Sequence, residues 1–174
     1  MLSAVKFFIG IIQMIIDLQH KSDETDVEKL LDLAFGPDRH SKAAYSFREG
    51  VPAIGDLSFV IRDGGKLIAT LQFWPVQIKG QDVLLLGPIA VEPELQGKGY
   101  GIGLMRHGLE RAKMLGYKRV VLVGDEPYYA RLGFSRQMAD NFTMEGQKDL
   151  SRLLALELEP GAFSGLAGAI EKHQ

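Results

Sequence analysis

A buried strand that runs into a glycine-rich turn and then a helix constrains this chain more than any other feature. Residues 84–103 read LLLGPIAVEPELQGKGYGIG. The apolar beginning is typical of a strand buried on both faces, and Pro93 should end it because proline cannot donate to a ladder. From Gly97 to Gly103 every second residue is glycine, and a helical spacing of apolar residues begins at Ile102. A strand, a glycine-rich turn and a helix N-terminus therefore follow one another directly.

This succession of elements is suited to binding an anion such as a phosphate group. The first N–H groups of a helix have no partner inside the helix, and the helix dipole favours negative charge at that end. Glycine residues let an anion approach the backbone closely. We therefore expect the turn to hold a phosphate-bearing ligand. A purely structural role, in which the glycines only solve a packing problem, is the alternative.

The two common nucleotide-binding motifs do not match these glycines. No register supplies the G-x-G-x-x-G of a Rossmann fold, and a P-loop would need Ser or Thr after Lys98, where Gly99 stands. The motif that does match is Q-x-x-G-x-G, formed by Gln96, Gly99 and Gly101 after the strand end at Pro93. It resembles the acetyl-CoA signature of the GNAT superfamily of N-acetyltransferases.

A second motif lies one predicted strand later and resembles the same family. Residues 128–134 read YYARLGF. They are similar to the aromatic-Tyr-x-x-x-Gly-Phe segment of GNAT enzymes, with Tyr128 in the aromatic position. The resemblance covers residues 51–158. Within the family, this stretch is similar to a bacterial subgroup of predicted acetyltransferases. It implies that Tyr129 lies beside the thioester sulfur and is the catalytic general acid, with packing over Phe134 as the alternative.

The resemblance also implies acetyl-CoA as co-substrate and a set of residues that bind it. An N–H group near Ala90 and Val91 would donate to the oxyanion that develops during transfer. The implied binding residues come from the strand end, the turn and the start of the helix: Ile89, Ala90, Val91, Gln96, Gly97, Lys98, Gly99, Tyr100, Gly101 and Ile102.

The general base is not assigned. Many GNAT enzymes place a glutamate on the central strand, but residues 83–91 contain no carboxylate. Glu92, Asp125 and Glu126 lie near the site in sequence, although each also fits a solvated loop charge. Ordered water is the remaining proton acceptor.

The predicted reaction is the transfer of an acetyl group to a primary amine of a small molecule, peptide or protein. Direct attack of the amine on the thioester needs no protein nucleophile, which suits a chain without cysteine. A non-catalytic acyl-CoA-binding or regulatory module is the alternative, and a phosphate-ligand binder unrelated to CoA is a third option. The sequence does not identify the acceptor.

Composition argues against several other kinds of partner. The formal net charge of −2 gives no reason to expect nucleic acid. No metal site is expected, because there is no cysteine and the histidines lack ligand spacing. We expect a cytoplasmic protein without a membrane partner, for which a homodimer is one option. The four histidines are His20, His40, His107 and His173.

The N-terminal sixteen residues, MLSAVKFFIGIIQMII, allow two interpretations. Their apolar run, residues 7–16, is too short to span a bilayer, and no small-x-small cleavage site follows it. We expect residues 1–13 to be an N-terminal extension and residues 14–174 to form a single N-acetyltransferase domain. A signal peptide or anchor is the alternative.

The patterns along the chain predict a mixed α/β domain. The family resemblance implies a twisted, mostly antiparallel sheet of six to seven strands, splayed at the central strand and flanked by about four helices. Phe73 and Trp74 are candidates for the acceptor pocket, with core packing as the alternative. The capping residues Thr25 and Glu28 predict a first helix that carries apolar residues at positions 27–34. Further helices are expected at residues 41–49, 102–115 and from 127, and strands at residues 14–19, 57–61, 67–73, 83–91, 119–123, 153–158 and 167–170.

Overall fold

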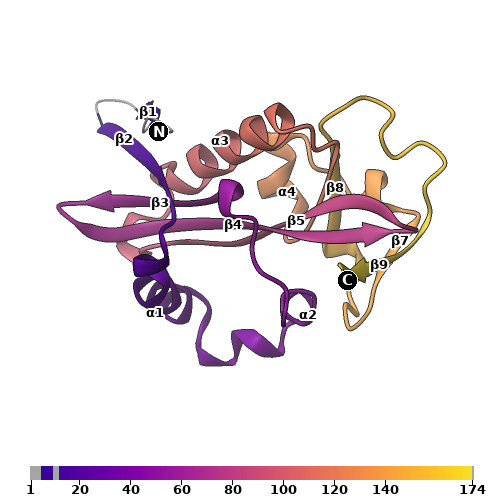
Figure 1. Ribbon diagram of the computed structural model, residues 1–174, viewed down its shortest axis with the longest axis horizontal. Helices are drawn as coiled ribbons and strands as arrows, with labels where there is room; N and C mark the ends of the chain where they lie inside the picture. Colours follow the sequence, from indigo (N-terminus) through magenta and orange to yellow (C-terminus); the bar gives the residue numbers. More distant parts are fainter. Residues whose placement is uncertain (1–4, 10–11, 174) are drawn as a thin grey trace.

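A computed structural model describes residues 5–9 and 12–173, which form one open, twisted sheet with helices on both faces (Figure 1). Within those residues the strands run in the order β1-β2-β3-β4-β5-β6-β8, while β9 pairs with both β4 and β7. Only the β5–β6 and β7–β9 pairings in this part of the chain are parallel. The predicted mostly antiparallel sheet is confirmed, with nine described strands rather than six or seven. The strands are β1 (Val5–Ile9), β2 (Ile12–Leu18), β3 (Ser58–Asp63), β4 (Lys66–Ile78), β5 (Gln81–Val91), β6 (Arg119–Val123), β7 (Phe142–Met144), β8 (Leu153–Glu157) and β9 (Gly168–Lys172).

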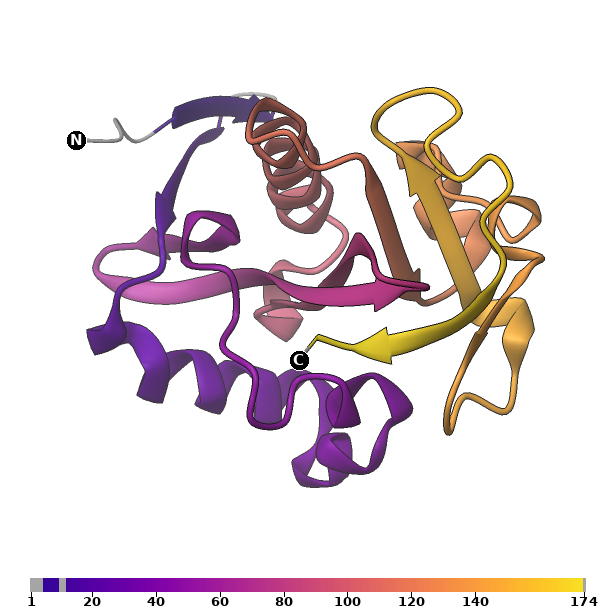
Figure 2. The same ribbon diagram turned by 45° about the vertical axis from the view of Figure 1, so that its right-hand side comes forward.

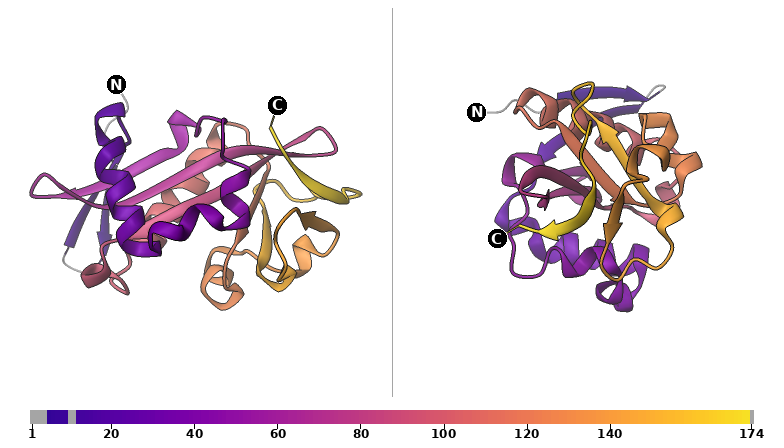
Figure 3. Two further views of the ribbon diagram at one scale, coloured as in Figure 1. Left: turned by 90° about the horizontal axis from the view of Figure 1, so that it is seen from below. Right: turned by 90° about the vertical axis from the view of Figure 1, so that its right-hand side faces the viewer.

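The two long helices pack on opposite faces of the sheet. They are α1 (Glu24–Phe35), which runs along the underside of the strands in Figure 3, and α3 (Tyr100–Met114). Strand β3 packs against both helices, because successive side chains of a strand point to opposite faces of the sheet. Val60 belongs to the cluster under α1, whereas Phe59 and Ile61 belong to the cluster under α3. Two single-turn helices, α2 (Ala43–Ser46) and α4 (Glu126–Tyr129), complete the set of α-helices in the described residues.

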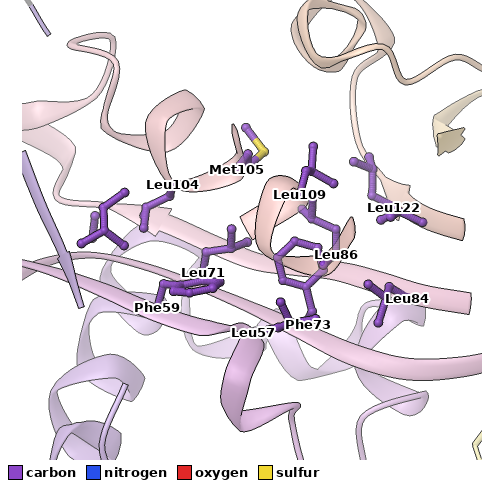
Figure 4. Close-up of a cluster of buried hydrophobic side chains, with 14 of the residues drawn as sticks. Leu57, Phe59, Leu71, Phe73, Leu84, Leu86, Leu104, Met105, Leu109 and Leu122 are labelled. Atoms are coloured by element: carbon purple, nitrogen blue, oxygen red, sulfur yellow. The ribbon is translucent and has the colours of Figure 1, made fainter. Parts of the chain in front are cut away.

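The main hydrophobic core lies between α3 and the sheet. Leu104, Met105 and Leu109 of the helix share one buried cluster with apolar side chains of β3, β4 and β5, which Figure 4 labels. Close approach of the helix depends on Gly108, where a β-carbon would lie 2.6 Å from Cε2 of Phe73. Phe73 is completely buried in this cluster, so its packing role holds, and it lines none of the three cavities described below.

The first helix does not begin with the predicted capping box. A 3₁₀ turn (Lys21–Asp23) precedes it, so α1 starts at Glu24, and Thr25 lies inside its first turn. The reciprocal contact lies earlier in the chain, where the Asp23 carboxylate accepts a hydrogen bond from the N–H of His20 at 2.8 Å. The carboxylate of Glu28 instead bonds the guanidinium of Arg39.

The helix predicted at residues 41–49 is largely absent. Residues Pro37–Ser41 form a 3₁₀ turn, and only Ala43–Ser46 are α-helical. A tertiary contact replaces the local pattern, because the side chain of Arg39 is 2% exposed and is held by two carboxylates of α1. Its Nε lies 2.8 Å from Asp32. These bonds hold the 3₁₀ turn against α1, and a single helical turn follows it.

The N-terminal part of the chain joins the sheet. Strand β1 pairs with β2 along its whole length, and β2 begins at Ile12 rather than at the predicted residue 14. Residues 1–4, 10 and 11 lie outside the described residues. In the described part of the chain, no helix has the length and apolar content needed to cross a bilayer.

The sheet opens along the second half of β5. This strand pairs with β4 from end to end, but with β6 only at Leu84 and Leu85. From residue 86 to residue 91 it has no ladder partner on the β6 side among the described residues. Figure 2 shows β6 and β8 turning away from β4 and β5. The predicted splay is confirmed, and it leaves backbone polar groups of β5 open toward the gap.

Candidate active site

The turn after β5 forms the anion-binding arrangement that the glycines predict. Gly99 adopts a left-handed conformation (φ 93°) as the N-cap of α3, and Gly97 also has a positive φ (76°). In the described residues, no backbone carbonyl or side chain accepts a hydrogen bond from the N–H groups of residues 97–102. Six consecutive donors are therefore available at a helix N-terminus, where the dipole favours an anion.

Five of these six residues border a cavity of about 460 Å³, here called the cradle cavity. The side chain of Gln96 donates from Nε2 to the carbonyl oxygen of Val91 at 3.3 Å, which ties the turn to the end of β5. Lys98 is exposed and does not line this cavity, unlike the other predicted binding residues described by the structure. The lining residues among them are Ile89, Ala90, Val91, Gln96, Gly97, Gly99, Tyr100, Gly101 and Ile102.

A second cavity of about 650 Å³, here called the acceptor cavity, lies in the opening between β5 and β6. Residues 41–48 form one wall, and residues 146–152 form another. The two walls meet where a β-carbon on Gly146 would lie 3.5 Å from Cβ of Ala43. Four residues line both cavities, so the two spaces meet at them: Phe35, Ile89, Tyr128 and Tyr129.

Tyr129 therefore lies where the two cavities meet. It ends α4, one turn after β6, and its ring packs edge-on against Phe134 at 6.3 Å between ring centroids. Burial raises the pKa of the Tyr129 phenol to about 12. The phenol thus keeps its proton at neutral pH and can donate it. The packing alternative also holds, because the same ring closes the core over Phe134.

Tyr128 is a site residue that sequence reasoning treated only as an aromatic neighbour. Its ring is edge-on to Tyr129 at 4.9 Å, and the guanidinium carbon of Arg131 lies 4.5 Å from its centroid. Its hydroxyl lies 3.1 Å from the point that a β-carbon on Gly101 would occupy. The hydroxyl therefore reaches the first turn of α3. The Tyr-Tyr pair in the motif was the available signal, but the direction of the first ring is not encoded locally.

The three candidate carboxylates have separate roles. Glu92 pairs with Lys66 at 2.7 Å, and Glu126 accepts a hydrogen bond from the N–H of Arg136 at 2.9 Å. Asp125 lines the acceptor cavity, where it pairs with Arg152 at 3.2 Å. Only Asp125 of these three therefore faces the space in which an acceptor amine would lie.

Two further residues of the acceptor cavity, Tyr45 and Arg48, were not found from the sequence. They belong to the segment after α1 in which the predicted helix is replaced by a turn. No local pattern marks them, because their position depends on the contacts of Arg39 with α1.

Comparison with known proteins agrees with this geometry. Residues 25–134 match the model of the acetyltransferase (GNAT) family. The uncharacterized N-acetyltransferase YhbS of Escherichia coli is 28% identical over 164 residues, which cover 92% of this chain and 97% of YhbS. The crystal structure of YhbS in complex with CoA superposes with a TM-score of 0.80 at 26% identity, covering 94% of this chain and 92% of that one.

A second solved structure is also similar over nearly the full length. A GNAT family acetyltransferase from Brucella melitensis, in complex with acetyl-CoA, gives a TM-score of 0.69 at 26% identity, with 92% of this chain and 96% of that chain covered. The family match spans more than half of the chain and includes the glycine turn and both tyrosines. The chain belongs to the GNAT acetyltransferase family.

Proposed function

We propose that this protein is an acetyl-CoA-dependent N-acetyltransferase that acts on a primary amine by direct attack on the thioester. One observation carries the proposal: the cradle cavity and the acceptor cavity meet at Tyr129. A thioester held by the cradle and an amine held in the acceptor cavity can therefore react at this point. Reacting atoms that are held in contact gain a large rate advantage over the same groups free in solution.

The residues of the cradle fit CoA. The unpaired N–H groups of residues 97–102 match a pyrophosphate, and no side chain at Gly97, Gly99 or Gly101 obstructs its approach. The open edge of β5, residues 86–91, offers backbone donors and acceptors to the amide groups of a pantetheine arm. YhbS and the Brucella protein, which were solved with CoA and acetyl-CoA, support this assignment.

When bound, acetyl-CoA supplies a thioester carbonyl carbon that an amine nitrogen can attack. The N–H groups near Ala90 and Val91 are the proposed donors to the developing oxyanion. Tyr129 is the proposed general acid: its hydroxyl gives a proton to sulfur as the carbon–sulfur bond breaks. The attacking amine nitrogen loses one proton to water and water returns one proton to the Tyr129 phenolate, so the products are an N-acetyl amide and the CoA thiol.

The acceptor cavity favours an enzyme over a non-catalytic CoA-binding module. A module of that kind needs only the cradle, whereas here a second cavity reaches the same tyrosine. The test is to incubate the protein with acetyl-CoA and a panel of primary amines, measuring thiol release and a mass gain of one acetyl group. Tight acetyl-CoA binding without any acetylated amine would favour the module.

A further inference from the structure

The acceptor cavity contains a buried positive charge with no ion-pair partner among the described residues. The side chain of Arg48 is 9% exposed, and no carboxylate described by the structure lies within ion-pair distance of it. Its Nε is buried without a hydrogen-bond acceptor. Burial lowers the pKa of Arg48 to about 10, so the guanidinium is still charged at neutral pH. A hydrogen bond with the Tyr45 side chain supplies no carboxylate. A buried cation without a counter-ion is costly for folding and favours a ligand that supplies the anion.

The neighbouring Arg39 shows what a structural arginine looks like in this protein. Both arginines are buried, and both contact the ring of Tyr45, at 5.4 Å for Arg39 and 4.7 Å for Arg48. Arg39, however, is neutralised by Glu28 and Asp32 of α1. The two cations thus flank one aromatic ring, and only the cation on the cavity side lacks a carboxylate.

The backbone of β5 brings Arg48 close to the inferred reaction centre. Its Nη2 lies 3.3 Å from the point that a β-carbon on Gly87 would occupy. Gly87 has a φ of 117°, and the absence of a side chain leaves this space to the guanidinium. Gly87 precedes by two residues Ile89, which lines both cavities. An anion on Arg48 and an amine beside Tyr129 can therefore belong to one small molecule.

A second buried donor that lacks an acceptor in the described part of the chain belongs to a residue that lines a cavity together with Arg48. Nε1 of Trp74 is buried without an acceptor among the described residues. Trp74 and Arg48 together line a cavity of about 480 Å³, which adjoins the acceptor cavity at Tyr45, Arg48 and Pro88. Two unsatisfied donors on residues that line one cavity favour a ligand group with two acceptor oxygens, toward which the side chains must turn because both atoms are enclosed.

The remaining charges of the acceptor cavity also favour an anionic ligand. Its described lining includes two carboxylates, Asp125 and Asp149, against four cations. Asp125 is paired with Arg152 at 3.2 Å, and Asp149 accepts a hydrogen bond from the N–H of Ser151 at 3.0 Å. The four cations are Lys42, Arg48, Lys148 and Arg152.

We infer that the acceptor is an amine that also carries a carboxylate, such as an α-amino acid, and that Arg48 binds this carboxylate; the inference rests on the proposed acetyl transfer. The planar guanidinium matches a carboxylate in a two-point contact, and Trp74 Nε1 supplies a further donor. A single buried cation balances one negative charge, which favours a carboxylate over a phosphate dianion.

The inferred contact also bears on the missing general base. Cations near an ammonium group lower its pKa, which increases the fraction of neutral, nucleophilic amine. The excess of positive charge in the acceptor cavity therefore does part of the work that a carboxylate base does elsewhere. A substrate carboxylate paired with Arg48 would reduce this excess from two positive charges to one without reversing its sign.

The test compares matched amines on matched variants. The α-amino acids and their carboxamides are assayed with the wild-type protein, Arg48→Met and Arg48→Lys, and kcat/KM is measured for each pair. We expect Arg48→Met to lower kcat/KM for amino acids by about 30-fold or more, and for carboxamides by less than about 3-fold. Arg48→Lys should be intermediate, because it keeps the charge and loses the planar fork. Comparing variants on the same amine removes the effect of each amine's own pKa.

Arg106→Met is the matched control, since it removes an exposed arginine of α3 that lines none of the three cavities. It should change both activities by less than about 3-fold, because exposed charges contribute little. Equal losses for amino acids and carboxamides in Arg48→Met, or no loss in either, would overturn the inference. So would a preference of the wild-type protein for aminophosphonates over amino acids.

A binding experiment separates this inference from the proposed function. N-acetyl amino acids and their carboxamides are titrated into the CoA-bound protein by calorimetry. Binding of the carboxylate form alone, lost in Arg48→Met and weakened in Trp74→Phe, supports the site even where no amine is acetylated. If Arg48→Met does not fold, Arg48→Lys and Trp74→Phe carry the comparison. Acetylation of amines without any preference for the carboxylate would overturn the inference and leave the proposed function intact.

Discussion

Gly124 lies directly beneath the ring of Tyr129, so close that a β-carbon at position 124 would fall 2.2 Å from Cε2 of the ring. Gly124 follows the last residue of β6, and its N–H donates to the carbonyl of Arg152 at 2.8 Å. The backbone at this point therefore cannot move away easily. The absence of a side chain at one residue thus determines where the proposed general acid lies.

Gly124→Ala should therefore reduce turnover without removing the phenol. The methyl group would displace the Tyr129 ring, and displacing a catalytic group by about 1 Å can cost about 10²-fold in rate. The measurement is kcat with the best amine, together with a thermal melt. Gly55→Ala is the control, because a β-carbon there meets no atom within 4 Å. If both effects act through Tyr129, the double variant Gly124→Ala/Tyr129→Phe should be no slower than Tyr129→Phe alone.

Tyr129→Phe tests the general acid itself. The ring and its packing on Phe134 are kept, but the proton donor is lost, and we expect kcat to fall by about 10²–10⁴-fold. Acetyl-CoA affinity and melting temperature should change little, because the swap conserves shape. Tyr117→Phe is the control for removing a hydroxyl outside both cavities among the described residues. Turnover near the wild-type rate in Tyr129→Phe would assign the tyrosine to packing alone.

Gly99→Val or Gly101→Val should abolish acetyl-CoA binding while the protein stays folded. At Gly101, a β-carbon would lie 3.1 Å from the Tyr128 hydroxyl, and larger side chains would fill the cradle cavity. Gly64→Val controls for backbone strain, since Gly64 shares a positive φ with Gly99 but lies at the β3–β4 turn. Isothermal titration calorimetry measures the affinity, and wild-type affinity in either cradle variant would refute the assignment.

Asp32→Ala should destabilise the protein more than Asp26→Ala. Loss of Asp32 removes a bond at 2.8 Å to the buried Arg39, while Glu28 remains as a partner. We expect a loss of about 1–2 kcal/mol in the free energy of unfolding, because the carboxylate is half exposed. Asp26 pairs with Lys29 on the surface, and its loss should cost less than about 0.5 kcal/mol. Urea unfolding measures both, and equal values would contradict the proposed role of the Arg39 contact.

Deprotonation of Tyr129 should cause no fall in kcat below about pH 10. Burial raises the pKa of this phenol from 10 to about 12, so the acid form is present below that pH and is lost only as pH rises through it. Between about pH 7 and about pH 10, kcat should stay level or rise as the amine loses its proton. A descending limb in that range that disappears in Tyr129→Phe would contradict the assignment.

The sequence predicts the elements that are determined by residues close to one another along the chain. The strand, turn and helix of residues 84–103 follow from glycine, proline and apolar spacing, and each of these acts within a few residues. Nine of the ten predicted binding residues consequently lie on one cavity, and Lys98, which is exposed, does not line it. Strand β4 is longer than expected, since its last three residues pair with β9 from the far end of the chain.

The sequence does not predict what distant contacts decide. Arg48 and Tyr45 reach the acceptor cavity because Arg39 binds carboxylates of α1 and so holds the preceding turn against that helix. These contacts join residues up to eleven positions apart and leave no periodic pattern in the sequence. The start of α1 moved for a related reason, since Asp23 also binds Arg62 of β3. Side chains that satisfy charges across the fold thus override local capping and helix signals.

The cradle is made of main-chain groups, whereas the acceptor cavity is lined by residues from five separate segments. Every amino acid except proline carries the N–H that the cradle uses, so most substitutions in the turn preserve that donor as long as the glycine conformations survive. Binding of the acyl donor thus depends on backbone conformation, whereas binding of the acceptor depends on which side chains line the cavity. New acceptor specificities can therefore arise by exchanging a few side chains, such as those at positions 45, 48 and 74. The cradle, which binds the acyl donor whatever the acceptor is, stays unchanged.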